Sequence, residues 1–360
     1  MNRLTAMNHQ RQSGIAVVTA MLVVVLGSIT MVAIASRQQL SLQRERNEGA
    51  ILLARDLGVS GERFAAALLF RDRDAGDRNN TDSLDDDWAQ TIPPVPINES
   101  AAIQGCVWDL QGRLNLNNLV DAEGEAIPYE VERMQRLFGE LGIAVSKVQA
   151  VVDWVDENFD ATTPDGAEDD YYTGLDPAYR AANAPFVTPS ELKLVRGFSP
   201  SVPEEAEDYA LLIPHVSALP TDNGPVPINV NTATPEVLAS QSDDMKGLAG
   251  DLSRWDSSAY EDYPECEDIF DLADEGPETL SGGERDTTPF ESTLLFQDEA
   301  DPGGGNGIDI GPDGSYDVRS EFFQVRIDVI TESVRLSQYT VFSRDDEGRT
   351  QVLYRSRDTP

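Results

Sequence analysis

The chain has 360 residues, with 64 acidic residues against 27 lysines and arginines and a formal net charge of −37. At roughly 100–200 residues per domain, this length predicts more than one folded unit, and so acidic a chain does not bind DNA or RNA through a broad basic surface. Two cysteines and two histidines exclude a disulfide-rich scaffold and a histidine-rich metal site.

An uncharged segment near the N-terminus predicts a membrane-spanning helix over residues 15–36. Between Arg11 and Arg37 there are 25 uncharged residues, and a helix needs ~20 to cross a bilayer. Arg3 and Arg11 precede the segment, which predicts that the leading residues stay in the cytoplasm and that the body lies outside. The alternative is a secretory signal peptide, whose apolar region runs only ~7–15 residues. We expect one uncleaved helix that continues to about Phe70, because no proline appears before Pro93.

The residues before this segment resemble a type IV prepilin leader over residues 1–14. The sequence Arg11-Gln12-Ser13-Gly14 precedes Ile15. The resemblance implies that a prepilin peptidase cuts between Gly14 and Ile15 and that the amine of Ile15 is then methylated. Most members of that family carry a glutamate five residues into the mature chain, where this chain has Thr19. A carboxylate is costly in lipid unless it is paired, and in pilins its partner is the amine of the preceding subunit. Its absence therefore suits a subunit at the filament tip.

Residues 37–120 are expected to form the first part of the body. From Arg71 to Pro96 the sequence is polar and rich in turn-forming residues, which predicts a surface loop. The alternation from Ile103 to Val120 predicts a hairpin around Gln111-Gly112.

Residues 121–273 are expected to form a helical domain. The segments Tyr129–Leu141 and Val145–Val155 are amphipathic. Thr188-Pro189-Ser190-Glu191 is a capping box with proline at the first helical position, and a second Thr-Pro pair at Thr234 opens another short helix.

The C-terminal part, residues 274–360, is expected to begin with a loop over residues 274–314. Three strands follow, at Phe322–Ile330, Val334–Ser343 and Thr350–Arg355, because β-branched and aromatic residues alternate there. The fold class is therefore α+β. We expect a long N-terminal transmembrane and amphipathic helix on an antiparallel sheet, which a large all-α insertion interrupts. The resemblance of the leader to prepilins implies that the sheet is pilin-like, and the insertion resembles helix-hairpin-helix or SAM-like domains.

Several short motifs are distributed over the helical region. They are Asp153-Trp154-Val155-Asp156, Gly166-Ala167-Glu168-Asp169-Asp170-Tyr171-Tyr172, Pro177-Ala178-Tyr179, Asn183-Ala184-Pro185-Phe186, Ser190-Glu191-Leu192, Arg196-Gly197 and Ile228-Asn229-Val230-Asn231-Thr232-Ala233. Together with the leader, this combination is similar to the K-type minor pseudopilin of type II secretion systems. The resemblance implies a non-enzymatic subunit that initiates or caps a pseudopilus for the export of folded proteins across the outer membrane. It also implies a single-pass inner-membrane protein with a periplasmic body, and I-type and J-type minor pseudopilins and the major pseudopilin as partners.

An acidic loop after residue 155 is the best candidate metal site. Oxygen-bearing side chains at alternate positions allow a tight loop to surround calcium, and members of the resembled family bind calcium. The pattern departs from a calcium-binding helix–loop–helix, because Ala161 stands in place of the usual glycine. The alternative is a solvated acidic loop. The candidate ligands are Asp156, Asn158, Asp160, Thr162, Asp165, Glu168 and Asp169.

A second acidic segment, residues 298–317, could hold a cation but is better interpreted as a flexible surface loop. Its oxygen-bearing side chains are Asp298, Asp301, Asn306, Asp309, Asp313 and Asp317.

The two cysteines, Cys106 and Cys266, are 160 residues apart. In an oxidising compartment they are expected to form one disulfide between the first part of the body and the end of the helical domain. The alternative is two separate buried thiols.

Two other classes of function have some support in the sequence. Residues Ile228–Glu236 resemble a helix-hairpin-helix motif, which would suit a periplasmic DNA-binding or uptake factor, and the leader alone would also suit a type IV pilus minor pilin. However, seven acids and two bases between Asn229 and Asp262 would repel phosphate, so no nucleic acid partner is expected. The sequence has no metalloprotease, serine hydrolase or phosphate-loop motif, which argues against an enzyme.

Overall fold

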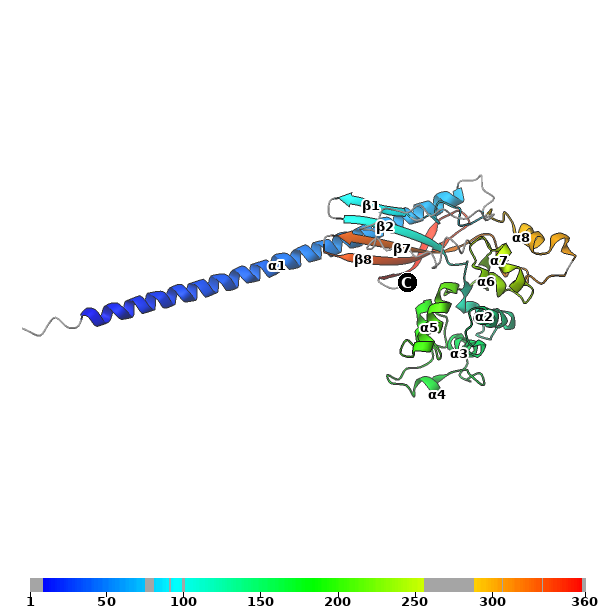
Figure 1. Ribbon diagram of the computed structural model, residues 1–360, viewed down its shortest axis with the longest axis horizontal. Helices are drawn as coiled ribbons and strands as arrows, with labels where there is room; N and C mark the ends of the chain where they lie inside the picture. Colours follow the sequence, from blue (N-terminus) through cyan, green and yellow to red (C-terminus); the bar gives the residue numbers. More distant parts are fainter. Residues whose placement is uncertain are drawn as a thin grey trace, which may run out of the picture.

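The computed structural model describes residues 9–74, 81–90, 92–98, 101–255, 288–305, 307–331 and 333–357. Its longest element is α1 (His9–Asp74), an unbroken helix of 66 residues. The first half of α1 extends away from the body, and the second half lies along the sheet (Figure 1). Among the described residues, α1 is the one helix that is long and apolar enough to cross a membrane. The expected continuous helix is therefore present.

A five-stranded antiparallel sheet forms the support for α1. Its order is β1 (Ile92–Asn98), β2 (Ala101–Asp109), β7 (Phe322–Thr331), β8 (Arg335–Arg344) and β9 (Thr350–Arg357). The three predicted C-terminal strands are confirmed. The chain leaves the sheet after β2 and returns at β7, and these two strands pair over nine residues from Ala101 with Thr331 to Asp109 with Phe323. The sheet is thus continuous across a long insertion.

Two predictions about the first part of the body were wrong. The hairpin is formed by β1 and β2, not by strands flanking Gln111-Gly112, and β1 lies where a proline-rich loop was expected. Proline lacks an amide hydrogen and is tolerated on an edge strand. The β1–β2 register is accordingly irregular on both sides of Val95 and Pro96.

Apolar side chains of α1 pack against one face of the sheet. The core between them contains Ala54, Ala65, Leu69, Trp88, Val107, Phe323, Val325, Ile327, Val329 and Phe342. Gly61 allows the helix to approach closely, because a Cβ atom there would lie 2.8 Å from Cγ2 of Ile327. Glu62, which is 5% exposed, accepts hydrogen bonds from Arg355 on β9 at 2.5 and 2.7 Å and from Thr340 on β8 at 2.9 Å. These contacts fix both the position and the rotation of α1.

The insertion is largely helical and lies beyond the end of the sheet (Figure 1). Its α-helices are α2 (Pro128–Glu140), α3 (Val148–Val155), α4 (Asp169–Tyr172), α5 (Pro203–Leu212), α6 (Pro235–Ala239), α7 (Ala249–Leu252) and α8 (Thr293–Ala300). Its 3-10 helices are η1 (Leu116–Leu119), η2 (Val145–Lys147), η3 (Pro189–Leu194), η4 (Ile213–His215), η5 (Met245–Gly247) and η6 (Pro302–Gly304). The capping box at Thr188 is confirmed and opens η3, and Thr234 caps α6 as predicted.

The insertion differs from the expected all-α domain in two respects. It contains two parallel pairs of very short strands, β3 (Leu114–Asn115) with β4 (Val216–Ser217) and β5 (Ile228–Asn229) with β6 (Tyr316–Asp317). The segment expected to be a loop over residues 274–314 contains α8, which Ser292 caps and whose Phe296 and Ala300 are buried in the core of the insertion. The predicted boundary at residue 273 lies outside the described residues.

A buried polar cluster joins the insertion to the sheet. Asp109, at the end of β2, accepts hydrogen bonds from the hydroxyl groups of Thr232 at 2.5 Å and Ser320 at 2.6 Å, and from the side-chain amide of Asn229 at 3.0 Å. The same Asn229 amide donates to the Asp82 carbonyl at 3.0 Å and to Ser320 at 2.9 Å. Burial raises the pKa of Asp109, and the hydroxyl groups of Ser320 and Thr232 oppose that rise. These polar groups come from four segments that are distant in the sequence. Their hydrogen bonds form only when the four segments meet in the fold.

We predict that Asn229→Ala lowers the free energy of unfolding by about 2–4 kcal/mol, because it leaves several buried polar groups without their partners. Denaturant unfolding of the purified chain measures this. Asn223→Ala, in an exposed loop of the same insertion, is the matched control and should change little. Equal stability of both variants would contradict the role given to the cluster.

Candidate functional site

The predicted calcium loop connects α3 to α4. Asp153 is the third residue from the end of α3 and is 0% exposed. Asp156, directly after α3, and Glu168, directly before α4, are 3% and 4% exposed. Between them Asn158, Asp160 and Thr162 are exposed. The loop thus carries three buried acids at its base and polar side chains along its rim.

Hydrogen bonds hold the loop over these acids. The Thr162 amide donates to Asp153 Oδ2 at 3.0 Å, and Asn158 Nδ2 donates to Asp156 Oδ2 at 2.8 Å. Asn183 Nδ2 donates to the Asn158 carbonyl at 2.5 Å and to Glu168 Oε2 at 3.5 Å. Gly166 is required for this close packing, because a Cβ atom there would lie 2.1 Å from Asp153 Oδ2.

Four oxygens at the base of the loop are buried without a hydrogen-bond donor in the described part of the chain. They are Oδ1 of Asp153, Oδ1 of Asp156, Oε1 of Glu168 and Oδ1 of Asn183. Burial, followed by the charge of Asp153, raises the pKa of Asp156 to about 6. Burial also raises the pKa of Glu168 to about 7, and the charges of Asp156 and Asp153 add to this shift. Buried carboxylate oxygens that accept no hydrogen bond suit a hard divalent cation, which prefers oxygen ligands.

The structure divides the seven candidate ligands. Asp156 and Glu168 belong to the buried base, and Asn158 contacts Asp156 directly. Asp160 and Thr162 lie on the exposed rim, and Asp165 is half-buried. Asp169 has other partners, since it forms an ion pair with Arg180 at 3.2 Å and accepts a hydrogen bond from the backbone amide of Ala181 at 3.2 Å.

Sequence reasoning missed Asp153 and Asn183. A signal for Asp153 was available, because it is the one charged residue of α3, whose other residues except Gln149 are apolar. Asn183 has a positive φ of 42°, a conformation that asparagine tolerates better than most residues. Its role depends on a fold that returns residue 183 to residue 158, and sequence spacing does not reveal such a return.

The second acidic segment forms local turns. Asp298 accepts from the Gly303 amide, Asp301 from the Gly307 amide and Asp309 from the Gly311 amide, at 3.3, 3.2 and 2.9 Å. Asp317 lies 3.8 Å from Arg319, and Asn306 lies outside the described residues. Asp298, Asp301 and Asp309 thus bind the backbone of their own segment. The segment is only partly a loop, because it also contains the end of α8, η6 and β6.

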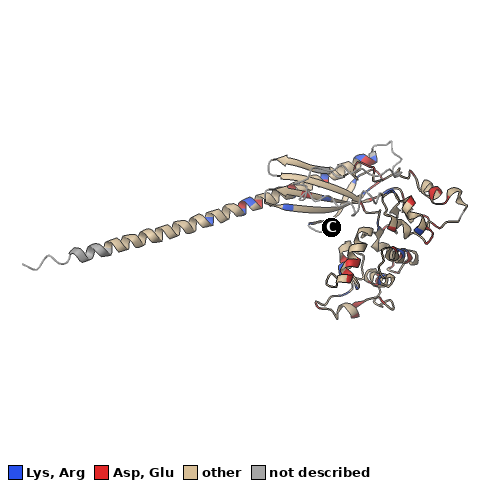
Figure 2. Ribbon diagram, in the orientation of Figure 1, with Lys and Arg blue, Asp and Glu red and all other residues tan. Residues whose placement is uncertain are grey.

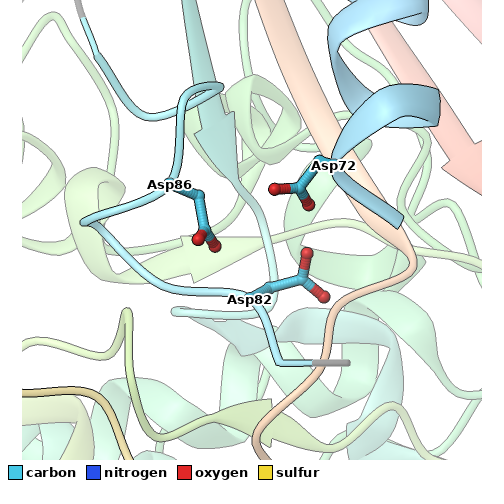
Figure 3. Close-up of side chains that lie close together, drawn as sticks. All are labelled: Asp72, Asp82 and Asp86. Carbon is cyan, nitrogen blue, oxygen red and sulfur yellow. The ribbon is translucent and has the colours of Figure 1, made fainter. Parts of the chain in front are cut away.

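A different acidic cluster was not foreseen from the sequence. Asp72 at the end of α1 and Asp82 and Asp86 in the following loop bring carboxylate oxygens within 4.8 Å of one another (Figure 3). Arg344, which is 0% exposed in its side chain, pairs with Asp72 at 3.2 Å and also with Asp82, and Arg73 lies 3.7 Å from Asp82. Burial and the charges of Asp86 and Asp82 raise the pKa of Asp72 to about 7. Because arginines already supply positive charge, this cluster is best interpreted as an ion-pair network that fixes the end of α1 to β8.

The structure describes only part of the other predicted sites. Cys106, on β2, is a disulfide cysteine and not a free thiol. Cys266 lies outside the described residues, so its pairing with Cys106 stays a prediction. Gly14 and Ile15 lie within the backbone of α1, and cleavage and methylation there also stay predictions. Thr19 donates to the Ala16 carbonyl within its own helix at 3.0 Å.

The helix-hairpin-helix-like motif has its amides occupied internally. The amide of Ile228 donates to the Ser315 carbonyl, that of Asn229 to the Gln111 carbonyl and that of Val230 to the Asp317 carbonyl. The side chain of Asn231 exchanges two hydrogen bonds with the backbone of Phe290, at 3.1 and 2.8 Å. Backbone amides used in this way cannot also contact phosphate, so the motif joins segments of the chain.

Comparison with known proteins gives a consistent result. The family described as type II secretion system (T2SS), protein K, matches residues 112–221. Type II secretion system protein K of Pseudomonas aeruginosa is 36% identical over 248 residues, which cover 67% of this chain and 71% of that protein. The protein of the same name from Aeromonas hydrophila is 28% identical over 361 residues, which cover 96% and 97%.

Among solved structures, the chain matches the crystal structure of the GspK-GspI-GspJ complex from the type 2 secretion system of enterotoxigenic Escherichia coli. The TM-score is 0.65 at 20% identity, and the match covers 88% of this chain and 100% of the matched chain. This likeness supports the mixed fold, with a long N-terminal helix on an antiparallel sheet.

We predict that calcium stabilises the chain through the buried acids of the α3–α4 loop. At a hundredfold excess over its dissociation constant, calcium should raise the melting temperature by roughly 5–10 °C, and chelation should reverse this. Glu168→Gln should remove most of the effect, whereas Asp170→Asn, at an exposed neighbouring position, should keep it. A melting temperature insensitive to both calcium and chelator would refute the site.

The raised pKa values of Asp156 and Glu168, about 6 and about 7, also predict a pH dependence. Without a cation the folded chain holds protons that the unfolded chain has released, so the free energy of unfolding should fall as the pH rises toward 7. Calcium must displace the same protons, so its affinity should increase between about pH 5.5 and about pH 7.5. Titration calorimetry at the two pH values tests this, and equal affinities would count against these acids as ligands.

Proposed function

The chain belongs to the type II secretion system protein K family and is a minor pseudopilin of that system, and from this premise we propose that it occupies the tip of the pseudopilus. It initiates or caps the filament and is not an enzyme. The alignment with the Pseudomonas aeruginosa relative, at 36% identity over 71% of that protein, is the observation that carries the family assignment.

Two features support the tip position. Thr19 stands where most pilin-like subunits carry a glutamate, and its hydroxyl is satisfied by the helix itself, so it needs no amine from a subunit ahead. The helical insertion lies beyond the end of the sheet, on the side away from the exposed half of α1 (Figure 1). A subunit docking above this chain would meet the insertion.

The membrane arrangement follows from α1. The apolar half of α1 is long and apolar enough to cross a membrane, and none of it is buried in the body. We place this half in the inner membrane as a single span, with residues after about 36 in the periplasm. A prepilin peptidase would cut between Gly14 and Ile15 on the cytoplasmic side, and the amine of Ile15 would then be methylated.

The partners follow from the proposed position. The matched solved structure is a complex of three proteins, GspK, GspI and GspJ, and we propose that this chain likewise assembles with I-type and J-type minor pseudopilins above the major pseudopilin. Nucleic acid is not among the proposed partners, because the acidic residues are widely spread over the insertion (Figure 2) and like charge repels phosphate.

Calcium is the proposed ligand of the α3–α4 loop. Asp153, Asp156 and Glu168 would supply buried carboxylate oxygens, and Asn158 and Asn183 lie beside them. The ion would neutralise these acids and hold the loop between α3 and α4 in one conformation. Its contribution would be structural.

We predict that a Gly14→Val substitution blocks leader removal, because the peptidase must accommodate the residue at the cleavage point. The unprocessed chain should be heavier by the 14-residue leader, and mass spectrometry of the membrane fraction measures this. Ser13→Ala is the neighbouring control and should be processed. Normal processing of the Gly14 variant would remove the leader assignment.

We further predict that deletion of the gene abolishes secretion of exoproteins and leaves DNA uptake intact. Both are measured in the same strain, with the deleted gene restored from a plasmid as the control. Lost uptake with normal secretion would instead favour the DNA-uptake alternative and would contradict the proposed function.

A further inference from the structure

Three carboxyl groups meet where α1 ends. Asp72 lies in the last turn of the helix, and Asp82 and Asp86 lie in the following loop, with oxygens of all three within 4.8 Å of one another (Figure 3). Asp82 and Asp86 are 1% and 4% exposed, whereas the side chain of Asp72 is 16% exposed. Asp72 is therefore the member of the cluster that exchanges a proton with water most readily.

The positive charge beside this cluster comes from two arginines. Arg344 on β8 pairs with Asp72 at 3.2 Å and also with Asp82, and Arg73 on α1 lies 3.7 Å from Asp82. Three ionised carboxylates against two guanidinium groups leave one negative charge in excess. Such an excess is unfavourable in a buried site, because water does not screen it there.

The next charged groups around the cluster do not remove this excess. They are two arginines and three acids: Arg71, Arg319, Asp87, Asp109 and Asp346. Arg71 is paired with the exposed Asp87 at 3.0 Å. Arg319 and Asp346 have opposite effects on the pKa of Arg73, and Asp109 adds negative charge beside Asp82. The cluster therefore needs one proton to be neutral.

Hydrogen bonds show which acid holds that proton. Asp82 accepts from the backbone amide of Ser320 at 2.8 Å, and Asp86 accepts from that of Ser83 at 2.7 Å. Backbone donors stabilise the ionised form of a carboxyl group. Among the described residues, no backbone amide donates to the carboxyl group of Asp72. Burial, followed by the charges of Asp86 and Asp82, raises the pKa of Asp72 to about 7.

The cluster connects three parts of the molecule. Arg344 on β8 also donates to the carbonyls of Leu69 on α1 at 3.3 Å and Ser320 at 2.9 Å. The Asp82 carbonyl accepts from Asn229 of the insertion at 3.0 Å. A displacement of Asp82 or Arg344 is thus transmitted to the helix, the sheet and the insertion together.

We propose that Asp72, Asp82 and Asp86 form a latch that a proton closes. With one proton on Asp72 the cluster is neutral, and the last turn of α1 stays fastened to β8 and to the loop. When that proton is lost, three ionised carboxylates repel one another and the last turn opens more often. The junction of α1, the sheet and the insertion is thereby sensitive to pH. This property goes beyond the proposed function and does not depend on it.

Hydrogen exchange of the full chain, purified in detergent, measures the opening. Mass spectrometry follows the amides of residues 65–74, with correction for the pH dependence of exchange in a free amide. Asp72 has a pKa of about 7 in the closed state and its ordinary value of 3.8 in an open one, so opening should become roughly tenfold more frequent between pH 6 and pH 8. Opening that is equally frequent at both pH values would overturn the proposal.

A variant of the titrating residue tests where the proton is held. Asp72→Asn keeps the shape of the side chain without its charge, so opening should be independent of pH and as rare at pH 8 as in the wild type at pH 6. Asp85→Asn is the matched control, because Asp85 is exposed in the same loop, and it should retain the tenfold change. A change that persists in Asp72→Asn, or is lost in Asp85→Asn, would contradict the latch.

A second variant leaves Asp72 and its bond to Arg344 in place. Asp86→Asn removes one of the like charges beside Asp72, so Asp72 should release its proton more easily. The midpoint of the change in exchange should therefore move to a lower pH. An unchanged midpoint would show that the three acids do not act as one cluster.

Discussion

The arrangement of the molecule depends on one buried carboxylate. Asp109 ends the strand that leads out of the sheet, and its oxygens accept from Thr232, Ser320 and Asn229. All of these groups are buried, so each lost partner would leave a polar atom unsatisfied at a cost of about 1–3 kcal/mol. A hydrogen-bonded cluster of this kind tolerates little displacement. It therefore sets the position of the insertion relative to the sheet more specifically than apolar packing alone.

Charged contacts fix the position of α1 on the sheet. Glu62 is bound by Arg355 near the middle of the packed half, and Arg344 binds Asp72 at the end of the helix. Burial alone would raise the pKa of Glu62, but its hydrogen bonds with Arg355 and Thr340 outweigh burial and hold the pKa below its usual range. Two fixed points, ten residues apart along the helix, define both its depth and its rotation. The direction of the membrane-spanning half follows from them, because α1 has no break between its two halves.

Local patterns in the sequence predicted individual helices and strands, whereas contacts between distant residues could not be predicted. The long apolar run predicted α1, and the alternation of residue types predicted β7, β8 and β9. In such elements the spacing of apolar residues along the sequence reveals the buried face. The strand β1 was missed because its prolines indicate a loop unless the chain is known to run at an edge. For the α3–α4 loop, the spacing pointed to Asp156 and Glu168, which lie at its buried base. Asn183 was not foreseen, because it reaches the loop only through the fold. The Asp72, Asp82 and Arg344 network joins residues more than 250 positions apart for the same reason.

The distribution of charge gives the two ends of the body different roles in the proposed assembly. The insertion carries many acids (Figure 2), and Asp160, Asp170 and Asp222 are among the exposed ones. Three more acids are buried at the base of the α3–α4 loop. Like charge at this end opposes stacking of one copy on another, and a cation in the loop would remove only part of it. By contrast, residues 37–63 of α1 contain five arginines and four acids, so charge opposes association along this part of the helix far less. A subunit built in this way joins a filament along one side and ends it on the other, as a single copy at a tip requires.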